Sequence, residues 1–310
     1  MSDATVSSAV AVPSPRQLAW QRRRRSWSRF AHEFASHKSG MAGLFILVGF
    51  VLMALLAPLL YPSHQLDITT NLANPTWAKP SITYPLGTDS NGISVMAQIF
   101  WGARVSLLVG LCATLMAVVI GTLVGIASGH YHGGAGMLLE RFTDWFLVIP
   151  FVPLAIVVIT LVGGGLGTTI FVIGVTSWAG TARLVRAQTL SLEERPYLER
   201  ARVLGSSNWQ QMTRHILPNV FPLVLANATL TVSIAILTET TLAFLGLGDP
   251  LHVSWGTMLD NAYSDAAILR GAWWWVLPPG ICVVLIVLSF TLMGRTLEVI
   301  FNPQLGRDRS

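Results

Sequence analysis

Long stretches without any charged side chain restrict the folding of this chain more than any other feature. Asp, Glu, Lys and Arg make up only 11% of the residues, against roughly 25% in an ordinary soluble domain. A helix needs roughly 20 predominantly apolar residues to cross the hydrocarbon core of a bilayer. The sequence therefore predicts an all-α membrane protein, with spans in five charge-free stretches: 39–66, 105–139, 145–182, 215–238 and 271–294.

The third stretch is long enough for two spans, which brings the expected total to six transmembrane helices. Its middle reads Gly-Gly-Gly-Leu-Gly at residues 163–167, and glycine tolerates turn geometries that helix interiors forbid. Before this turn, Pro150 and Pro153 each remove an intrahelical hydrogen bond, so we expect the third span to bend. The bend fits either an opening pathway or the general tolerance of proline in membranes.

Lys and Arg are distributed unevenly between the two sides that six spans define. If the N-terminus is cytoplasmic, the outer segments hold only Lys79, Arg104 and Arg270, and the inner segments hold the other basic residues, including four consecutive arginines at 22–25. Cytoplasmic loops carry an excess of Lys and Arg, so we expect both termini in the cytoplasm. The net charge of +5 then indicates contact with anionic membrane lipid rather than with nucleic acid.

The alternation of polar and apolar segments predicts four parts. Residues 1–38 form a basic cytoplasmic tail, and residues 39–104 form the first span and an external loop. Residues 105–296 form a core of five spans that contains a polar insertion at 191–218. Residues 297–310 form a cytoplasmic C-terminal tail.

The polar insertion has the pattern of two short helices joined at a glycine. Pro196 suits the first position of a helix, where its missing N–H costs nothing. Gly205 suits the left-handed conformation that ends a helix. Ser207 followed by Gln210 is a capping-box pattern for a second helix. We expect Pro218 to separate this second helix from the fifth span.

The first of these short helices carries an apolar stripe. Glu199, Arg200 and Arg202 fall toward the other face. The stripe is about two turns long, too short to bury much surface by itself, so docking in a groove of another protein is favoured over a loop that lies on lipid. The stripe consists of residues spaced at i, i+4 and i+7, which are Tyr197, Ala201 and Leu204, with Leu198 beside them.

The same segment resembles a motif of a known transporter family. The sequence ERARVLGSSNWQQMTRHILP, residues 199–218, is similar to the EAA loop in the membrane-spanning subunits of ABC importers. Arg200 replaces the middle alanine of that pattern, and His215 stands where isoleucine is usual. In that family the loop contains a coupling helix that sits in a cleft of the ATPase subunit. The matching positions are Glu199, Ala201, Gly205, Leu217 and Pro218.

Further segments resemble the C-type permease of dipeptide, oligopeptide and nickel importers, and the similarity covers about residues 40–305. The chain departs from the family at 91–95, where NGISV replaces a usual Gly-Arg-Asp triplet, and at Arg295, which replaces a common acidic residue. The similar segments are LGTD at 86–89, GARVSLLVG at 102–110, TETTLAFLGLGDP at 238–250, SWGTML at 254–259 and LMGRTLEVIFNPQL at 292–305.

This resemblance implies a type I ABC importer permease fold and a non-enzymatic pore subunit of the bacterial inner membrane. The expected partners are a second, B-type permease, two ABC ATPase subunits or domains and an extracytoplasmic substrate-binding protein. Di- or oligopeptides are the expected cargo, with nickel or another small solute as the alternative. The ATPase-binding surface is expected to comprise Tyr197, Leu198, Glu199, Ala201, Arg202, Leu204, Gly205 and Ser206.

ATP and Mg are expected on the ATPase partners, because this chain has no Walker A motif. Such a motif ends in Gly-Lys-Ser/Thr, whereas Lys38 and Lys79 are the only lysines and neither follows glycine. His32 and His37 are five residues apart and so do not share a helix face as zinc ligands at i, i+4 do. The sequence His-Tyr-His at 130–132 is interpreted as a solvated turn. We therefore predict no catalytic residue and no metal site.

Glu239 is the one clear charged residue inside a predicted span. A carboxylate in a membrane span usually faces the bundle interior or water. Two interpretations of Glu239 stay open: it lines the translocation route or pairs across two permeases, or it lies high enough to reach the external interface. An ion-driven secondary transporter, which needs ionisable groups at mid-membrane and inverted repeats, is the less favoured alternative for the whole chain.

Overall fold

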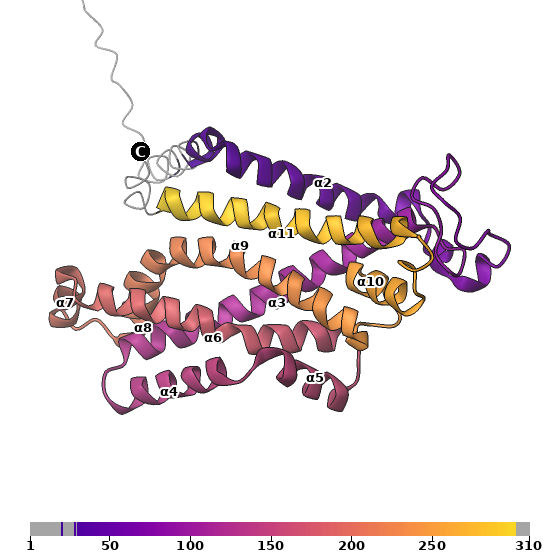
Figure 1. Cartoon of the computed structure of the whole chain (residues 1–310). Coiled ribbons are helices and arrows are strands. Elements are labelled where there is room, and N and C mark those ends of the chain that lie inside the picture. The colour runs from indigo at the N-terminus through magenta and orange to yellow at the C-terminus, as the bar shows by residue number, and fades with distance from the viewer. Residues whose placement is uncertain (1–19, 21–27, 29, 302–310) are drawn as a thin grey trace, which may run out of the picture.

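The computed structural model describes residues 20, 28 and 30–301. Its helices form an elongated bundle, with α2 and α11 along one side and α4 and α5 along the other (Figure 1). We call the end that carries α7 and α8 the α7 end, and the opposite end the α10 end. The helices are α2 (Lys38–Leu60), α3 (Val95–His130), α4 (Gly134–Val148), α5 (Phe151–Val162), α6 (Leu166–Glu193), α7 (Pro196–Val203), α8 (Asn208–Gln211), α9 (Leu217–Leu242), α10 (Trp255–Ser264) and α11 (Trp273–Phe301), with short helical segments η1 (Ser63–Leu66), η2 (Ile68–Thr70), η3 (Met212–Ile216) and η4 (Ala243–Leu247).

The described helices agree with the predicted set of spans. Five of them are long and apolar enough to cross a membrane, and the total is six if α4 and α5, which meet at a bend of 88°, count as one span. The bend lies at Ile149 and Pro150, whose extended backbone ends α4 and precedes α5. The reversal at residues 163–167 is also confirmed, because Gly163 and Gly165 there have φ angles of 99° and 153°, which residues with a Cβ rarely adopt.

The most extensive helix contact is between α3 and α6. Gly121, Gly125 and Gly129 recur every fourth residue along α3 and face α6. A Cβ atom at Gly125 would lie 2.6 Å from the carbonyl oxygen of Ala182, so only glycine permits this approach. Small residues at such spacing allow membrane helices to pack closely, and they hold the 36-residue α3 along α6.

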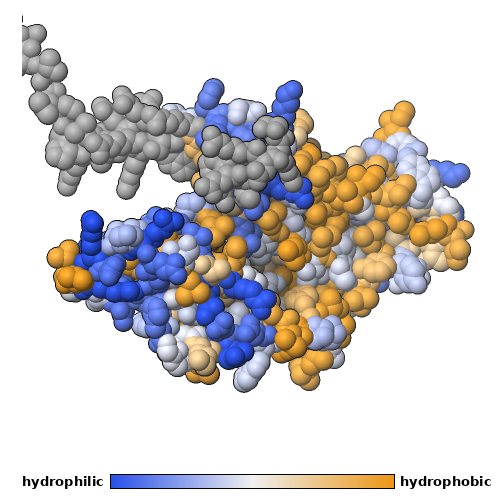
Figure 2. Space-filling view, turned by 60° about the vertical axis from the view of Figure 1, so that its left-hand side comes forward, coloured by the Kyte–Doolittle hydropathy of each residue, from blue (hydrophilic) through white to orange (hydrophobic). Residues whose placement is uncertain are grey.

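Apolar side chains cover much of the outside of the bundle. On α2, the side chains of Phe45, Leu55 and Leu59 are exposed, and Figure 2 shows a broad hydrophobic band beside a hydrophilic region on the visible face. An apolar surface of this extent is expected where lipid replaces water as the solvent.

The start of α3 differs from the prediction. Ser94 caps the helix, and its side chain accepts a hydrogen bond from the backbone N–H of Ala97. α3 therefore begins ten residues before the expected boundary at 104/105. Upstream of this cap, the carboxylate of Asp89 accepts a hydrogen bond from the backbone N–H of Asn91 at 2.8 Å, which keeps residues 89–91 in a turn outside the helix.

Two other predicted boundaries also fall inside helices. The expected core ends at residue 296, yet α11 continues to Phe301. Pro218 does not separate the second short helix from the fifth span, because α8, η3 and α9 follow one another without a break. Pro218 lies in the first turn of α9, where proline is compatible with a helix. Most of the predicted N-terminal tail and all of the C-terminal tail after residue 301 lie outside the described residues.

The tryptophans at 273–275 begin α11, and only Trp273 is exposed. Trp274 donates from Nε1 to the carbonyl oxygen of Thr88 at 3.2 Å. Trp275 packs against Trp77, with ring centroids 5.5 Å apart. The segment between α2 and α3 thus folds over the start of α11, which a local apolar pattern does not reveal.

Candidate functional site

In the polar insertion at the α7 end, α7 and the start of α8 lie where the sequence predicts two short helices, although α8 continues through η3 into α9. Pro196 occupies the first turn of α7, which ends at Val203 with Leu204 as its C-cap, and Gly205 follows this cap with a φ angle of 82°. Ser207 caps α8 and accepts a hydrogen bond from the backbone N–H of Gln210 at 3.3 Å. We refer to α7, the glycine turn and α8 together as the α7–α8 unit.

Leu198 joins this unit to the body of the bundle. Its side chain is fully buried, in an apolar cluster with Ile126 of α3, Leu192 of α6 and Val220 of α9. The sequence assigns Leu198 to the partner-binding surface. In this structure it belongs to the core of its own chain, because it is buried against residues of α3, α6 and α9.

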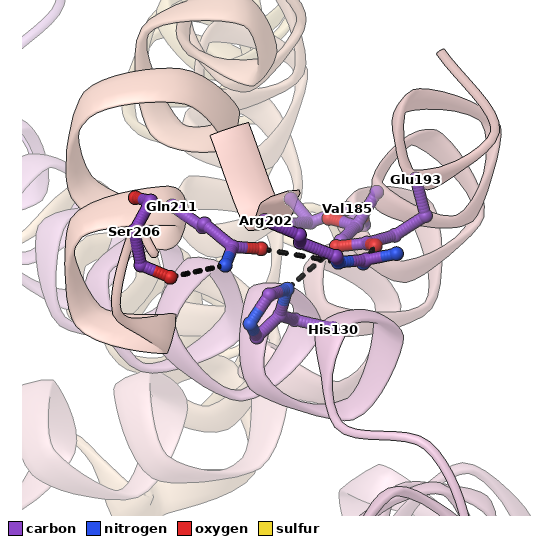
Figure 3. A network of polar contacts seen from close by, with 7 residues as sticks. His130, Val185, Glu193, Arg202, Ser206 and Gln211 are labelled. Carbon is purple, nitrogen blue, oxygen red and sulfur yellow. Dashed lines mark hydrogen bonds and ion pairs between the residues drawn. The ribbon is translucent and has the colours of Figure 1, made fainter. Parts of the chain in front are cut away.

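A buried carboxylate makes the second attachment (Figure 3). Glu193, the last residue of α6, has a side chain that is only 5% exposed. Its Oε1 atom lies 2.5 Å from Nδ1 of His130, at the end of α3. Its Oε2 atom accepts a hydrogen bond from Nη2 of Arg202 in α7, and the two side chains form an ion pair. Three helices therefore meet at one side chain.

The same arginine also links α7 to α8 within the α7–α8 unit. Arg202 donates from Nε to Oε1 of Gln211 at 3.3 Å, and Gln211 donates from Nε2 to the carbonyl oxygen of Ser206 at 2.8 Å. Figure 3 shows these groups in one continuous network. We call the five residues His130, Glu193, Arg202, Ser206 and Gln211 the anchor network. Two members of the predicted partner-binding surface, Arg202 and Ser206, thus make contacts within their own chain.

The prediction of a solvated turn at 130–132 is wrong for His130, which is 4% exposed. Gly129 brings the last turn of α3 so close to α6 that a Cβ atom there would lie 2.7 Å from Cβ of Thr189. This approach covers the imidazole, whereas His132 stays exposed.

Within the described part of the chain, no group of three or more His, Cys, Asp or Glu side chains is arranged to hold a metal ion.

The remaining predicted residues lie on the outer side of the α7–α8 unit. Leu204 is 86% exposed, and Glu199 is also exposed. Two exposed apolar residues were missed by the sequence analysis: Val203 and Trp209, at 84% and 70% exposure. An open groove of about 370 Å³ is lined by Tyr197, Arg200, Ala201, Leu204, Gly205, Ser206, Gln210 and His215.

Glu239 lies near the α10 end, inside the bundle. It is 4% exposed, and its Oε2 atom accepts hydrogen bonds from Ser106 Oγ of α3 at 3.2 Å and from Thr240 Oγ1 at 3.5 Å. Its side chain therefore does not reach an external interface, and this conformation leaves no exposed carboxylate to pair with a second subunit. Glu239 also borders a small void together with Asp249 and Ser254.

A larger cavity of about 680 Å³ opens at the α10 end. Asp249, on its wall, joins the start of α6 to the segment between α9 and α10. Burial acts to raise the pKa of Asp249, but hydrogen bonds from the backbone N–H of Leu251, from His252 Nδ1 and from the backbone N–H of Leu166 lower the pKa below its usual value. The carboxylates on this wall are Asp67, Asp249 and Asp260.

Comparison with known proteins assigns a family to this arrangement. The family of binding-protein-dependent transport system inner membrane components matches residues 118–307, more than half of the chain. The chain belongs to this family. A second family model, the N-terminal TM domain of oligopeptide transport permease C, matches residues 25–75 of the permease.

Similar proteins agree with this assignment. The permease is 33% identical to the dipeptide transport system permease protein DppC of Bacillus subtilis, over 87% of this chain and 83% of the relative. It is also 33% identical to the di/tripeptide transport system permease protein DppC of Pseudomonas aeruginosa, over 96% and 95%. In fold, it is similar to a chain of the MetNI methionine ABC transporter, with a TM-score of 0.52, 21% identity and coverage of 67% of this chain and 97% of that chain.

The family assignment makes the permease a multi-pass inner-membrane protein, and the α7–α8 unit lies within its matched region. The anchor network was not found from the sequence, because His130 and Glu193 are 63 residues apart. One signal was available, since both residues lie where a long apolar helix ends. A polar side chain at such a position often has a partner from another helix.

Proposed function

We propose that the permease is the transmembrane pore subunit of an ATP-driven ABC importer for di- or oligopeptides. The observation that carries this proposal is the α7–α8 unit, which presents exposed apolar side chains outward while Leu198 and the anchor network hold it to the bundle. A small, rigid apolar surface at the end of a membrane bundle suits docking in a groove of a partner protein. The family membership supports this assignment.

The partner at this surface is an ATPase subunit that faces the cytoplasm. Basic residues mark the α7 end, including Arg183, Arg186 and Arg214, and an excess of Lys and Arg is typical of the cytoplasmic side. Both chain termini lie in the cytoplasm in this orientation, and the α10 end faces outward. An extracytoplasmic substrate-binding protein docks there.

ATP and Mg bind to two ATPase subunits, since this chain lacks a Walker A sequence. Closure of these subunits displaces the α7–α8 unit, and the displacement passes to the spans that the unit contacts. The substrate path lies between the permease and a second, B-type permease, and lipid covers the rest of the apolar surface. The permease itself catalyses no reaction.

Co-purification tests the ATPase partnership. The permease is expressed with its ATPase subunits, and either Ala201→Glu or Leu204→Glu is expected to abolish their co-elution, because each places a charge in the apolar docking surface. Ile82→Glu is the control, since Ile82 is another highly exposed apolar residue and lies in the segment between α2 and α3, away from the α7–α8 unit. ATP-independent uptake by the permease alone would contradict the proposal and favour an ion-driven transporter.

Peptide cargo is favoured because relatives of the permease are named as dipeptide and di/tripeptide permeases. The assembled importer, with its binding protein, is expected to take up a labelled dipeptide or oligopeptide when ATP is supplied. Uptake of nickel ions without peptide uptake would support the alternative of a metal or small-solute importer.

A further inference from the structure

We propose that Glu193 is the positioning residue that links the α7–α8 unit to α3, so that movement of the unit reaches the α10 end through α3. This inference rests on the proposed function, in which an ATPase moves the α7–α8 unit. In this inference the carboxylate of Glu193 transmits the movement, because it binds Arg202 on the moving unit and His130 on α3.

The first step is the internal rigidity of the unit. Arg202 of α7 is bonded to Gln211 of α8, and Gln211 is bonded to the turn at Ser206. These bonds connect both helices and the turn between them. A force on the exposed surface at Leu204 therefore displaces the unit as one body and does not separate α7 from α8.

The second step is the cost of separating the unit from the bundle. The side chain of Glu193 is 5% exposed and that of His130 is 3% exposed, whereas that of Arg202 is 40% exposed, so the carboxylate depends on these two protein partners while Arg202 is in place. If the unit moved away alone, Arg202 would leave a buried carboxylate incompletely paired, which is strongly unfavourable. The ends of α3 and α6 therefore follow Arg202.

The third step concerns α3, which has no direct covalent connection to the unit. The chain runs from α6 into α7 through two residues, Glu194 and Arg195, so α6 receives the motion through the backbone. α3 receives it through side chains. Leu198 and Ile126 share an apolar cluster, but apolar contacts are non-directional, whereas the hydrogen bonds of Glu193 are charge-assisted and directional.

The fourth step is transmission along α3 itself. α3 is one continuous helix of 36 residues, about 54 Å long at 1.5 Å per residue, and its glycine face holds it along α6. Toward the α10 end, the carbonyl oxygen of Ile99 accepts a hydrogen bond from Trp255 Nε1 of α10 at 3.1 Å, and Ser106 donates to Glu239 of α9. α10 contributes Thr257, Asp260 and Asn261 to the wall of the 680 Å³ cavity.

The test measures coupling rather than assembly. The complete importer with the Glu193→Gln substitution is reconstituted in proteoliposomes, and uptake of a labelled peptide is divided by ATP hydrolysed. Glutamine keeps the side-chain size and removes the charge, so ATPase co-purification and hydrolysis are expected to persist. Uptake per ATP is expected to fall about tenfold, as for the loss of a charge-assisted hydrogen bond. Glu194→Gln is the matched control, because Glu194 is adjacent and exposed, and its ratio is expected to stay unchanged.

His130→Gln provides a second variant, which leaves the ion pair between Glu193 and Arg202 in place and weakens only the connection to α3. It is expected to reduce uptake per ATP as Glu193→Gln does, and it decides the question if Glu193→Gln does not assemble. The inference is overturned if uptake and hydrolysis fall in proportion in the assembled variants, or if neither changes. If the unmodified permease binds no ATPase subunit, the proposed function fails instead.

Discussion

Nδ1 of His130 lies 2.5 Å from Oε1 of Glu193, although the two residues are 63 positions apart in the sequence. This contact joins the end of α3 to the end of α6, at the place where the chain turns into α7. Because Arg202 binds the other oxygen of the same carboxylate, the loop that follows α6 is held by two spans rather than by its backbone connection alone.

Two leucines of the predicted docking surface are expected to behave differently when they are shortened. Leu198 is fully buried and Leu204 is 86% exposed. Leu198→Ala is expected to lower the free energy of unfolding by roughly 2–5 kcal/mol, because it leaves a cavity in the core. The apparent melting temperature of the purified permease in detergent measures this loss.

Leu204→Ala serves as the control for stability and is expected to leave the melting temperature unchanged, while it weakens association with the ATPase subunits. Equal losses of stability in the two variants would contradict the placement of Leu198 in the core and of Leu204 on the outer surface.

The contact between α3 and α6 is expected to be sensitive to a single methyl group. Gly125→Ala places a Cβ atom 2.6 Å from the carbonyl oxygen of Ala182 and 2.7 Å from Cβ of Val185, so the helices must move apart. We expect a loss of about 1–3 kcal/mol of stability, as for other overpacked sites, measured by thermal unfolding in detergent.

Gly180→Ala is the matched control for Gly125→Ala, since a Cβ atom at Gly180 of α6 would meet no neighbouring group within 4 Å. Alanine is the better helix former by about 1 kcal/mol, so this variant is expected to be neutral or stabilising. A tolerated Gly125→Ala would show that α3 and α6 are not in close contact in the membrane.

Glu239 is expected to act through its hydrogen bonds rather than through its charge. Glu239→Gln keeps an acceptor for Ser106 Oγ, so normal assembly and normal peptide uptake are expected. Glu239→Ala leaves this buried hydroxyl without its acceptor, at a cost of about 1–3 kcal/mol, which the melting temperature of the importer complex reports. Loss of uptake in a fully assembled Glu239→Gln variant would instead support a charged role on the substrate path.

Asp249 is expected to make stability depend on acid. Its pKa in the folded protein lies below the ordinary value of 3.8, because its hydrogen bonds outweigh the effect of burial. The ionised form therefore contributes stability above pH 3.8, and this contribution is lost as the pH falls through the lower folded value. The melting temperature of the wild type is expected to exceed that of Asp249→Asn at neutral pH, and the difference is expected to shrink as the pH falls below 3.8.

Asp260→Asn is the control for this measurement. Asp260 lines the same cavity, and its carboxylate has no hydrogen-bond partner among the residues that the structure describes. A pH-independent difference between the wild type and Asp249→Asn would mean that the hydrogen bonds of Asp249 do not depend on its charge.

The sequence by itself determined the number of spans, the reversal at 163–167, the bend at Pro150 and the limits of α7. Each of these depends on neighbouring residues alone: the length of an apolar stretch, the φ angle that glycine permits, or the hydrogen bond that proline lacks. Pro196, Gly205 and Ser207 also marked where α7 begins, where it ends and where α8 begins, because helix caps are local signals.

Only the tertiary structure decided which side chains of that segment face outward. Leu198 and Leu204 are equally apolar, yet Leu198 is buried in the bundle and Leu204 is exposed. Arg202 pairs with the buried carboxylate of Glu193, although its own side chain stays 40% exposed. Their directions depend on α3, α6 and α9, whose positions follow from packing at sites such as Gly125 and Gly129. The same physical reason applies to Trp274, His130 and Glu239, since each is covered by a segment that lies far away in the sequence.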